Sequence, residues 1–178
     1  LQSNEFNSNA YAITPYGEMY FGGINGINFF DPLAISTDTY VPPIVLTSLT
    51  QNGETLKTDV EVEELKEFTL QWPKNSFEFE FAALSYSQPN KNQYAYKLEN
   101  FDSSWNELGT KHSSLYTNLP GGTYTLKLRG SNSDGIWNDA GRSIKLTVIP
   151  PIWETWWFRG LFVLALGTTI AAGYRWRI

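Results

Sequence analysis

The sequence contains no cysteine and a single histidine, His112, among its 178 residues. Without cysteine the chain has no disulfide, no thiolate nucleophile and no thiolate metal ligand, and one histidine excludes a histidine-rich metal site within one chain. Basic residues are also few: 13 Lys and Arg against 18 Asp and Glu give a net charge of −5, without any basic block. The electrostatic footprint of a nucleic-acid-binding protein is therefore missing, and we expect neither a nucleic-acid partner nor a cofactor.

The start of the chain also lacks two features, an initiator methionine and a basic-then-apolar signal segment. We therefore expect Leu1 to lie inside a longer protein. Hydrophobic residues, in contrast, make up 42% of the chain and aromatic residues 16%. That composition favours a packed core over disorder, and the length suits one ordinary domain with attachments.

Residues 92–139 carry the clearest strand patterns. Large residues alternate with smaller or polar ones in two runs: Tyr94, Tyr96 and Leu98, then Tyr124, Leu126 and Leu128. Period-two alternation indicates strands that bury one face in a sheet. The turn at residues 119–122 contains a proline that fixes φ and glycines that supply a positive φ. Tyr124, directly after this turn, suggests the tyrosine corner of Greek-key sandwiches, in which a tyrosine hydroxyl bonds to nearby backbone.

A pair of prolines stands on each side of a predicted domain at residues 41–150: Pro42 with Pro43, and Pro150 with Pro151. Paired prolines stiffen the chain and suit domain junctions. About seven strands are predicted between them, at residues 44–50, 54–57, 68–72, 77–81, 94–98, 124–128 and 144–148. This spacing predicts an all-β sandwich of the immunoglobulin or fibronectin III type. Alternation further predicts the burial of four side chains, Phe79, Tyr96, Leu126 and Leu146.

Residues 1–33 are predicted to form a separate hairpin unit with strands at 10–14, 19–22 and 27–30, a turn at 15–17 and a two-residue turn at Asn25-Gly26. Three short strands cannot bury a core alone. The glycine-rich run at residues 17–26 is similar to a phosphate-binding loop. It lacks the Lys-Ser/Thr pair and opens no helix, which argues against that role.

The carboxy-terminal part, residues 153–175, has the composition of a membrane segment. Residues 156–174 provide 19 positions interrupted by one charge, Arg159, and span about 28 Å as a helix, just enough for a bilayer. Tryptophans lie before and at the start of the run, and arginines follow it: Trp153, Trp156 and Trp157, then Arg175 and Arg177. The positive-inside rule predicts that residues 176–178 begin the cytoplasmic side. The alternative is a buried carboxy-terminal helix of a soluble protein. Within the run, Gly167, Gly173, Ala171 and Ala172 leave a small-residue surface for helix pairing.

Three groups of residues have chemical potential, each with a structural alternative. The tyrosines and tryptophans form either a sugar-stacking platform or core and corner residues. The carboxylates Glu61, Glu63, Glu64 and Glu67 form either a glycosidase pair or a solvated loop. His112 is a candidate general base only with an orienting carboxylate and a nucleophile, and the sequence indicates neither. We therefore expect no enzymatic activity and no metal site.

The stretch from Tyr94 to Trp137 resembles the three-tyrosine (Y_Y_Y) domain of bacterial membrane sensor kinases. The structural signature consists of Tyr94, Tyr96, Trp105, Tyr116, Gly122, Tyr124, Asn132, Gly135 and Trp137. Asn100 departs from the expected glycine, but asparagine tolerates left-handed backbone better than most residues. Residues 3–7, 17–26 and 30–32 resemble the last repeat of the β-propeller that precedes this domain in Bacteroides-type hybrid two-component sensors.

The resemblance implies a membrane-proximal periplasmic fragment of a sensor histidine kinase in the inner membrane. It implies a homodimer that relays detection of a carbohydrate ligand, bound upstream by the propeller, to cytoplasmic kinase domains. The signal junction and membrane anchor would then be Pro150, Pro151, Trp153, Trp156, Trp157, Arg175 and Arg177. Two alternatives remain: a membrane-tethered glycan-binding or adhesive sandwich without signalling, and a secreted glycosidase, for which no active site is evident. A kinase domain encoded after Ile178 would decide between the first two.

Overall fold

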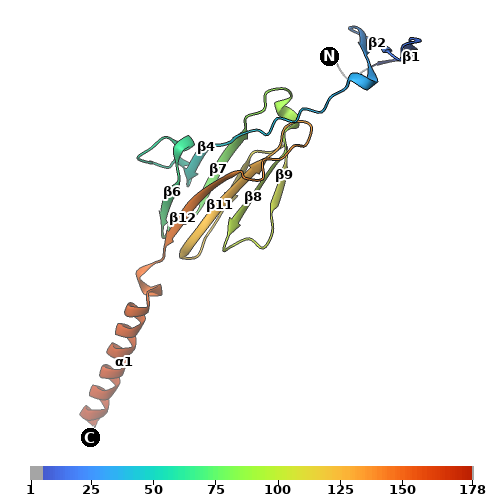
Figure 1. The fold of residues 1–178 in the computed structure, drawn as a ribbon. Helices are drawn as coiled ribbons and strands as arrows, with labels where there is room; N and C mark the ends of the chain where they lie inside the picture. Colours follow the sequence, from blue (N-terminus) through green and yellow to red (C-terminus); the bar gives the residue numbers. More distant parts are fainter. Residues whose placement is uncertain (1–5, 178) are drawn as a thin grey trace. The chain divides into compact units, whose positions relative to one another are not determined.

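The structure of the chain, a computed structural model, describes residues 6–177 (Figure 1). Contacts between residues divide the chain into two compact units, residues 1–38 and residues 39–178. The first unit contains a small sheet, and the second contains a sandwich and a long helix. Two sequence predictions, the propeller-like signature at residues 3–5 and the cytoplasmic residue Ile178, lie outside the described residues.

The first unit is an antiparallel sheet in the order β1-β2-β3, with strands at Phe6–Ile13, Met19–Gly23 and Gly26–Phe30. The predicted turn at residues 15–17 is present, with Gly17 at a φ of 91°. The two-residue turn predicted at Asn25-Gly26 is formed by Ile24 and Asn25 instead, because Gly26 pairs with Gly23 and begins β3.

Aromatic side chains occupy both faces of this small sheet. Phe21 lies between Phe6 and Phe30, with ring centroids 5.9 Å from each. Its neighbour Tyr20 points to the opposite face and stacks on Phe29 at 5.5 Å. Phe29 remains 67% exposed, because three strands alone have no second layer to cover them. The unit therefore presents apolar surface that its own residues do not bury.

The second unit is the predicted β-sandwich. Its first sheet has the order β10-β7-β4-β5, with strands at Ser113–Tyr116, Phe77–Ala83, Ile44–Gln51 and Glu54–Thr55. Its second sheet has the order β6-β12-β11-β8-β9, with strands at Glu67–Gln71, Arg142–Ile149, Gly122–Gly130, Tyr94–Glu99 and Asn106–Gly109. All neighbours are antiparallel except β6 and β12. Short 3₁₀ turns lie at Pro32–Ala34, Val62–Glu64, Pro89–Lys91 and Ile152–Glu154.

The sandwich has nine strands where about seven were predicted. The two additional strands, β9 and β10, have four residues each and read Asn-Glu-Leu-Gly and Ser-Ser-Leu-Tyr. Neither sequence has a clean apolar alternation, so neither is recognisable from periodicity alone. Both strands form at the edges of sheets by pairing with a strongly patterned partner, β8 or β7.

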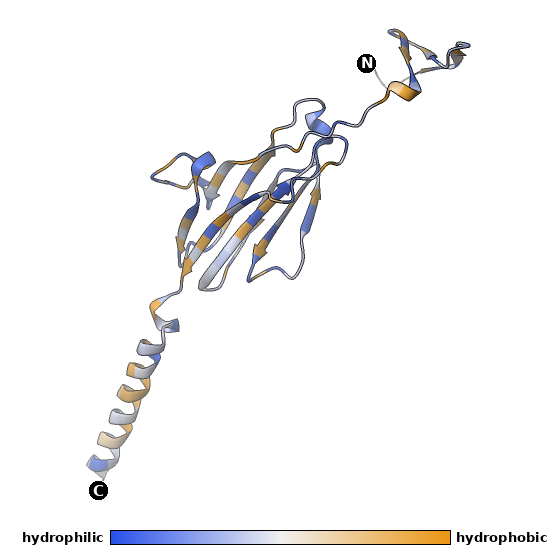
Figure 2. Cartoon of the chain, in the orientation of Figure 1, coloured by the Kyte–Doolittle hydropathy of each residue, from blue (hydrophilic) through white to orange (hydrophobic). Residues whose placement is uncertain are grey.

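The core lies between the two sheets and follows the alternation of each strand (Figure 2). Phe77, Phe79 and Phe81 of β7 are at most 1% exposed, whereas Glu78 between them faces solvent. They meet side chains of the opposite sheet that include the predicted core residues Leu126 and Leu146. Phe79, Leu126 and Leu146 are completely buried, as predicted. Tyr96 packs against the core but is only partly buried.

Two turns show how local backbone demands were met. Asn100 has a φ of 70°, which confirms that asparagine serves at this left-handed position. The expectation for the turn at residues 119–122 was wrong, because neither of its glycines has a positive φ and Asn118, just before it, has a φ of 52°. Gly121 instead allows a close approach, since a Cβ there would lie 2.6 Å from the Cβ of Pro150.

The helix α1 spans Trp156–Arg177. Residues 156–176 are long and apolar enough to cross a membrane, and no part of that window is buried by the described residues. Figure 2 shows hydrophobic colours along most of the helix, with hydrophilic residues near its ends. The described residues therefore do not bury this helix, as the alternative of a buried carboxy-terminal helix would require.

Replacing a core phenylalanine tests the position of the sandwich core. Phe79→Ala leaves a cavity between the sheets and should lower the free energy of unfolding by about 3 to 5 kcal/mol. Leu115→Ala, at a residue that is 56% exposed on the neighbouring strand β10, serves as the control and should change it by less than about 1 kcal/mol. Urea unfolding of the chain in detergent micelles, followed by near-ultraviolet circular dichroism, provides the comparison. Equal stability of the Phe79→Ala variant and the parent would show that β7 does not bury this face.

Candidate functional site

The signature tyrosines are distributed through the sandwich and do not line one pocket. Tyr94, Tyr116 and Tyr124 are each at most 7% exposed. Buried rings cannot stack on a sugar, which removes the platform interpretation for these three residues. The hydroxyl of Tyr124 donates to the carbonyl of Pro120 at 2.9 Å, the hydrogen bond expected of a tyrosine corner. Gly122 lies below this ring, where a Cβ would stand 3.4 Å from the Tyr124 hydroxyl.

Tyr116 joins the two sheets through a carboxylate that the sequence did not reveal. Its ring stacks 5.6 Å from that of Phe77, and its hydroxyl donates to Asp102 in the turn after β8. Asp102 also accepts from the Leu98 N–H at 2.7 Å and from the Asn106 amide at 3.0 Å. Burial, and secondarily the hydrogen bond and the charge of Asp102, raise the pKa of Tyr116 above its ordinary value of 10.0.

Tyr96 makes a second polar link between the sheets. Its hydroxyl accepts a hydrogen bond from Ser114 Oγ of β10 at 2.8 Å. Its ring contacts Phe79 edge to face, with centroids 5.3 Å apart. Partial exposure of Tyr96 therefore reflects a hydroxyl that has to reach a partner at the sheet edge.

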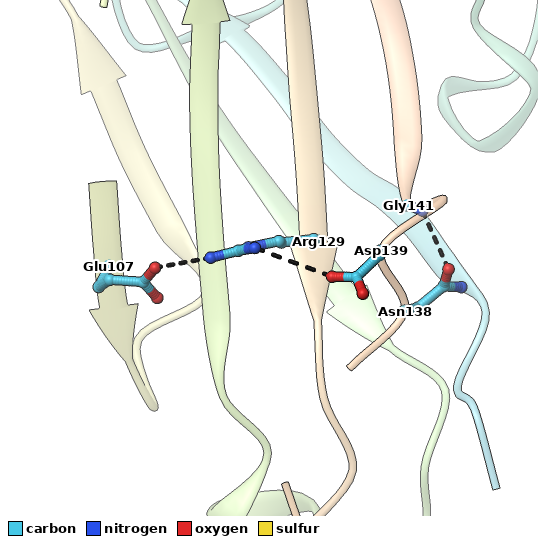
Figure 3. A network of polar contacts seen from close by, with 5 residues as sticks. All are labelled: Glu107, Arg129, Asn138, Asp139 and Gly141. Carbon is cyan, nitrogen blue, oxygen red and sulfur yellow. Dashed lines mark hydrogen bonds and ion pairs between the residues drawn. The ribbon is translucent and has the colours of Figure 1, made fainter. Parts of the chain in front are cut away.

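Trp105 and Trp137 hold one arginine between them on the second sheet. The guanidinium of Arg129, on β11, lies 4.3 Å from the ring centroid of Trp105 and 4.9 Å from that of Trp137. Arg129 also pairs with Glu107 at 2.8 Å and with Asp139 at 3.8 Å (Figure 3). Such a cation–π stack fixes both indole rings and the segments that carry them. Arg129 was not singled out from the sequence, because its two tryptophans lie 24 residues before and 8 after it.

Asn132 and Gly135 form a tight turn in the loop between β11 and β12. The Asn132 side chain is fully buried, and its Oδ1 accepts from the N–H groups of Asp134 at 3.0 Å and Ile136 at 2.9 Å. Gly135 has a φ of 84°, which a larger residue would adopt only with strain. These two signature residues therefore set the shape of this loop.

The predicted junction residues make specific contacts where the chain leaves the sandwich. The carbonyl of Ile149 accepts from the Trp72 N–H at 3.2 Å. Pro150 packs over Gly121, which has room for it only because it has no side chain. Trp153 meets Trp72 edge to face, with ring centroids 4.6 Å apart. We define this cluster of five residues as the exit junction.

The exit junction continues directly into α1. Arg159, in the first turn of the helix, places its Nε 3.4 Å from the Trp153 carbonyl. Trp156 and Trp157 are exposed on the same turn. Arg175 lies in the last turn of α1, and the helix ends at Arg177. Pro151 precedes the short 3₁₀ turn that joins β12 to the helix.

The remaining chemical candidates are exposed residues on the surface. Glu61, Glu63, Glu64 and Glu67 surround the 3₁₀ turn at Val62–Glu64 and the start of β6, and all four are exposed. The sequence indicated no carboxylate partner for His112, but the structure contains one. The Oε1 of Glu80, on β7, lies 2.8 Å from the Nε2 of His112. Both side chains of that pair are about half exposed. No group of three or more potential metal ligands occurs among the described residues.

Comparison with known proteins shows what this chain is similar to. Residues 85–148 match the family of the Y_Y_Y domain. A curated relative, "Histidine kinase P4" of Formosa agariphila, is 30% identical over 179 residues, covering 97% of this chain and 13% of the relative. The chain therefore spans a small part of that relative's length.

Two solved structures from B. thetaiotaomicron share the fold. The extracellular domain of BT3049, described as a hybrid two-component system, has a TM-score of 0.64 and 28% identity, covering 82% of this chain and 20% of that chain. The extracellular domain of BT4673, with the same description, has a TM-score of 0.57 and 27% identity, covering 79% and 20%.

The fold is a β-sandwich that the exit junction joins to a candidate membrane helix, and the solved structures that share it are extracellular domains. Residues 85–148 match the Y_Y_Y domain, and the chain is similar to part of a histidine kinase and to extracellular domains of two-component systems. The predicted resemblance is confirmed at this level.

The raised pKa of Tyr116 predicts alkaline loss of stability. Below pH 10 the folded and unfolded chains both keep this proton, so Tyr116 adds no pH dependence. Above pH 10 the unfolded chain ionises while the folded chain retains the proton, and stability falls as pH rises. Tyr116→Phe should make the fall above pH 10 shallower, by up to about 1.4 kcal/mol per pH unit.

Urea unfolding at pH 7 to 11 measures this slope for parent and variant. Between pH 7 and 9 the difference in stability between the two proteins should stay constant, which serves as the internal control. Parallel curves above pH 10 would contradict the role of the Tyr116 hydroxyl as a retained proton.

Proposed function

We propose that the chain is the membrane-proximal sensor segment of a hybrid two-component sensor histidine kinase. The observation that carries the proposal is the exit junction, which joins a rigid sandwich to a membrane-type helix with no flexible linker between them. Pro150 and Pro151 restrict the backbone there, and the contact of Trp72 with Trp153 adds a side-chain attachment. A displacement of the sandwich would therefore move the helix, where a flexible linker would absorb it.

The small sheet of the first unit supports the inference that a β-propeller precedes the sandwich. Its sheet carries aromatic residues on both faces, as a blade does when it lies between neighbouring blades. We infer that residues 1–33 are the last repeat of such a propeller. The carbohydrate ligand would then bind upstream of the sandwich, and this segment itself would relay the signal without catalysis.

The helix supports the membrane part of the proposal. Trp156 and Trp157 would lie at the outer interface, with Arg175 at the inner one, which places the amino-terminal side in the periplasm. Gly167 and Ala171 are four residues apart on one face of α1, a spacing that permits close approach of two helices in a homodimer. We therefore propose both this orientation of α1 in the membrane and its pairing in a homodimer.

The orientation of α1 has a direct test. Alkaline phosphatase and green fluorescent protein, fused in turn after Ile178 in a Gram-negative host, distinguish the periplasm from the cytoplasm. We expect fluorescence and no phosphatase activity, because the arginines at the carboxy-terminal end of the helix remain in the cytoplasm. Phosphatase activity from the first fusion would reverse the proposed orientation.

Mechanical transmission through the exit junction has a separate test in the full-length protein. Inserting Gly-Ser-Gly-Ser between Ile149 and Pro150 should abolish reporter induction by a polysaccharide digest that induces the parent, because a flexible insert lets the sandwich move without the helix. Binding of the digest to the ectodomain, measured by calorimetry, should be unchanged. A matched insert at the exposed turn after Asn52 is the control. Normal induction by the junction variant would make the sandwich a passive spacer.

A further inference from the structure

The segment that enters the sandwich, residues 39–43, is held by its backbone carbonyls. The carbonyl of Tyr40 accepts from the side-chain amide of Asn132 at 3.0 Å, and that of Pro42 accepts from the side-chain amide of Asn138 at 2.9 Å. The carbonyl of Pro43 accepts from the Leu84 N–H at 2.9 Å. Prolines have no N–H to donate, so this incoming segment depends on donors from elsewhere in the sandwich.

The side-chain oxygen of each asparagine accepts hydrogen bonds from its own loop. This orients the side-chain NH₂ group toward the incoming segment. Asn132 Oδ1 is occupied by two backbone N–H groups of its own turn. Asn138 Oδ1 accepts from the Gly141 N–H at 3.0 Å (Figure 3). Gly141 has a φ of 51°, and a Cβ there would stand 2.1 Å from the Leu128 carbonyl oxygen. The amide nitrogen of each asparagine therefore points toward a carbonyl that arrives from more than 90 residues away.

The Arg129 stack holds the flanks of Asn138 in the same place. Trp137 and Asp139 are its two chain neighbours, and both contact the Arg129 guanidinium. Arg129 also pairs with Glu107 of β9, which lies on the opposite side of Arg129 from Asp139 in Figure 3. The position of Asn138 is thus tied to β11 and, through Glu107, to the edge of the sheet.

The loop that carries both asparagines and the exit junction lie at opposite ends of one hairpin. Leu128 pairs with Arg142 next to the loop, and Gly122 pairs with Val148 next to the exit. The nine residues of β11 give a separation of about 30 Å at roughly 3.3 Å per residue. The same two strands therefore connect the incoming segment to the outgoing one.

We propose that Asn132 and Asn138 form a clamp that fixes the incoming segment to the β11–β12 hairpin, so that the sandwich follows movements of the chain upstream of it. Both are positioning residues. The inference rests on the proposed relay for its biological meaning, but the attachment itself is a property of this chain and is tested without any ligand or kinase.

Asn138→Asp isolates the donor. The carboxylate still accepts from the Gly141 N–H, but it has no N–H for the Pro42 carbonyl and repels it. Asn100→Asp is the matched control, because the Asn100 amide also donates to a backbone carbonyl, that of Thr123 at 3.0 Å, away from the incoming segment. If the added charge at residue 138 prevents folding, Asn138→Ala removes the same donor without charge.

Spin-label distances measure the attachment, and the cysteine-free sequence allows each label pair to be introduced directly. Labels at Val41 and Glu78 report on the incoming segment against the sandwich, and labels at Glu78 and Lys145 report on the sandwich alone. In the full chain in lipid nanodiscs, Asn138→Asp should at least double the width of the first distribution. It should leave the second distribution unchanged, and the control should change neither.

Two results would overturn the clamp. A first distribution of parental width in Asn138→Asp and Asn138→Ala would show that the incoming segment is held by other contacts. Broadening of both distributions would show that Asn138 serves the fold of the sandwich as a whole. Normal induction by the junction insert, or a periplasmic location of the residues after Ile178, would contradict the proposed relay. Neither result would contradict the clamp.

Discussion

Burial of one face of β7 between the two sheets is the interaction on which the rest of the structure depends. Phe77, Phe79 and Phe81 fill the space between the sheets, and their rings contact those of the tyrosines from the opposite sheet and from β10. Each tyrosine thus contributes its ring to a close-packed interior, where a loss of one side chain is felt by its neighbours. The hydroxyls of Tyr116 and Tyr124 then fix two turns to that interior, and the hydroxyl of Tyr96 links it to β10. The tyrosines of the pattern are in this sense a structural framework.

The framework gives two distant junctions a fixed relation to each other. At one end of the β11–β12 hairpin, asparagine amides hold the incoming carbonyls. At the other end, Gly121 and Trp72 hold the outgoing segment. Interiors of this density deform little, so a rigid sandwich passes on displacement better than it absorbs it. In this chain, Asn132 and Asn138 thus contact the segment that enters the sandwich, and Gly121 and Trp72 contact the segment that leaves it.

The sequence predicted those features that are local or periodic. The alternation of Phe77, Phe79 and Phe81 was sufficient to place the core, and the position of Tyr124 after a turn was sufficient to expect its hydrogen bond. The length and flanks of residues 156–174 were sufficient to expect an unburied helix.

Features that depend on distant partners were not predictable in this way. Asp102, Arg129 and the Glu80 partner of His112 are ordinary charged residues in the sequence, and only the fold brings them to Tyr116, the two tryptophans and the histidine. Gly121 was assigned a conformational role because glycine often has one in turns, whereas its function depends on Pro150, 29 residues later. The edge strands β9 and β10 form because their neighbours are strands, which no pattern within four residues reveals.

The central claim is that the chain leaves the sandwich in a fixed geometry set by Gly121 and Pro150. The most direct measurement is the distance distribution between spin labels at Lys145 on β12 and Leu161 in the first turns of α1, in lipid nanodiscs. The account predicts one narrow distribution for the parent. It predicts a shifted or broadened one for Gly121→Ala, whose methyl group would displace the Pro150 ring, and no change for Gly122→Ala, whose methyl group would only reach contact with Tyr124. A parent distribution already as broad as a free hinge allows would contradict the claim.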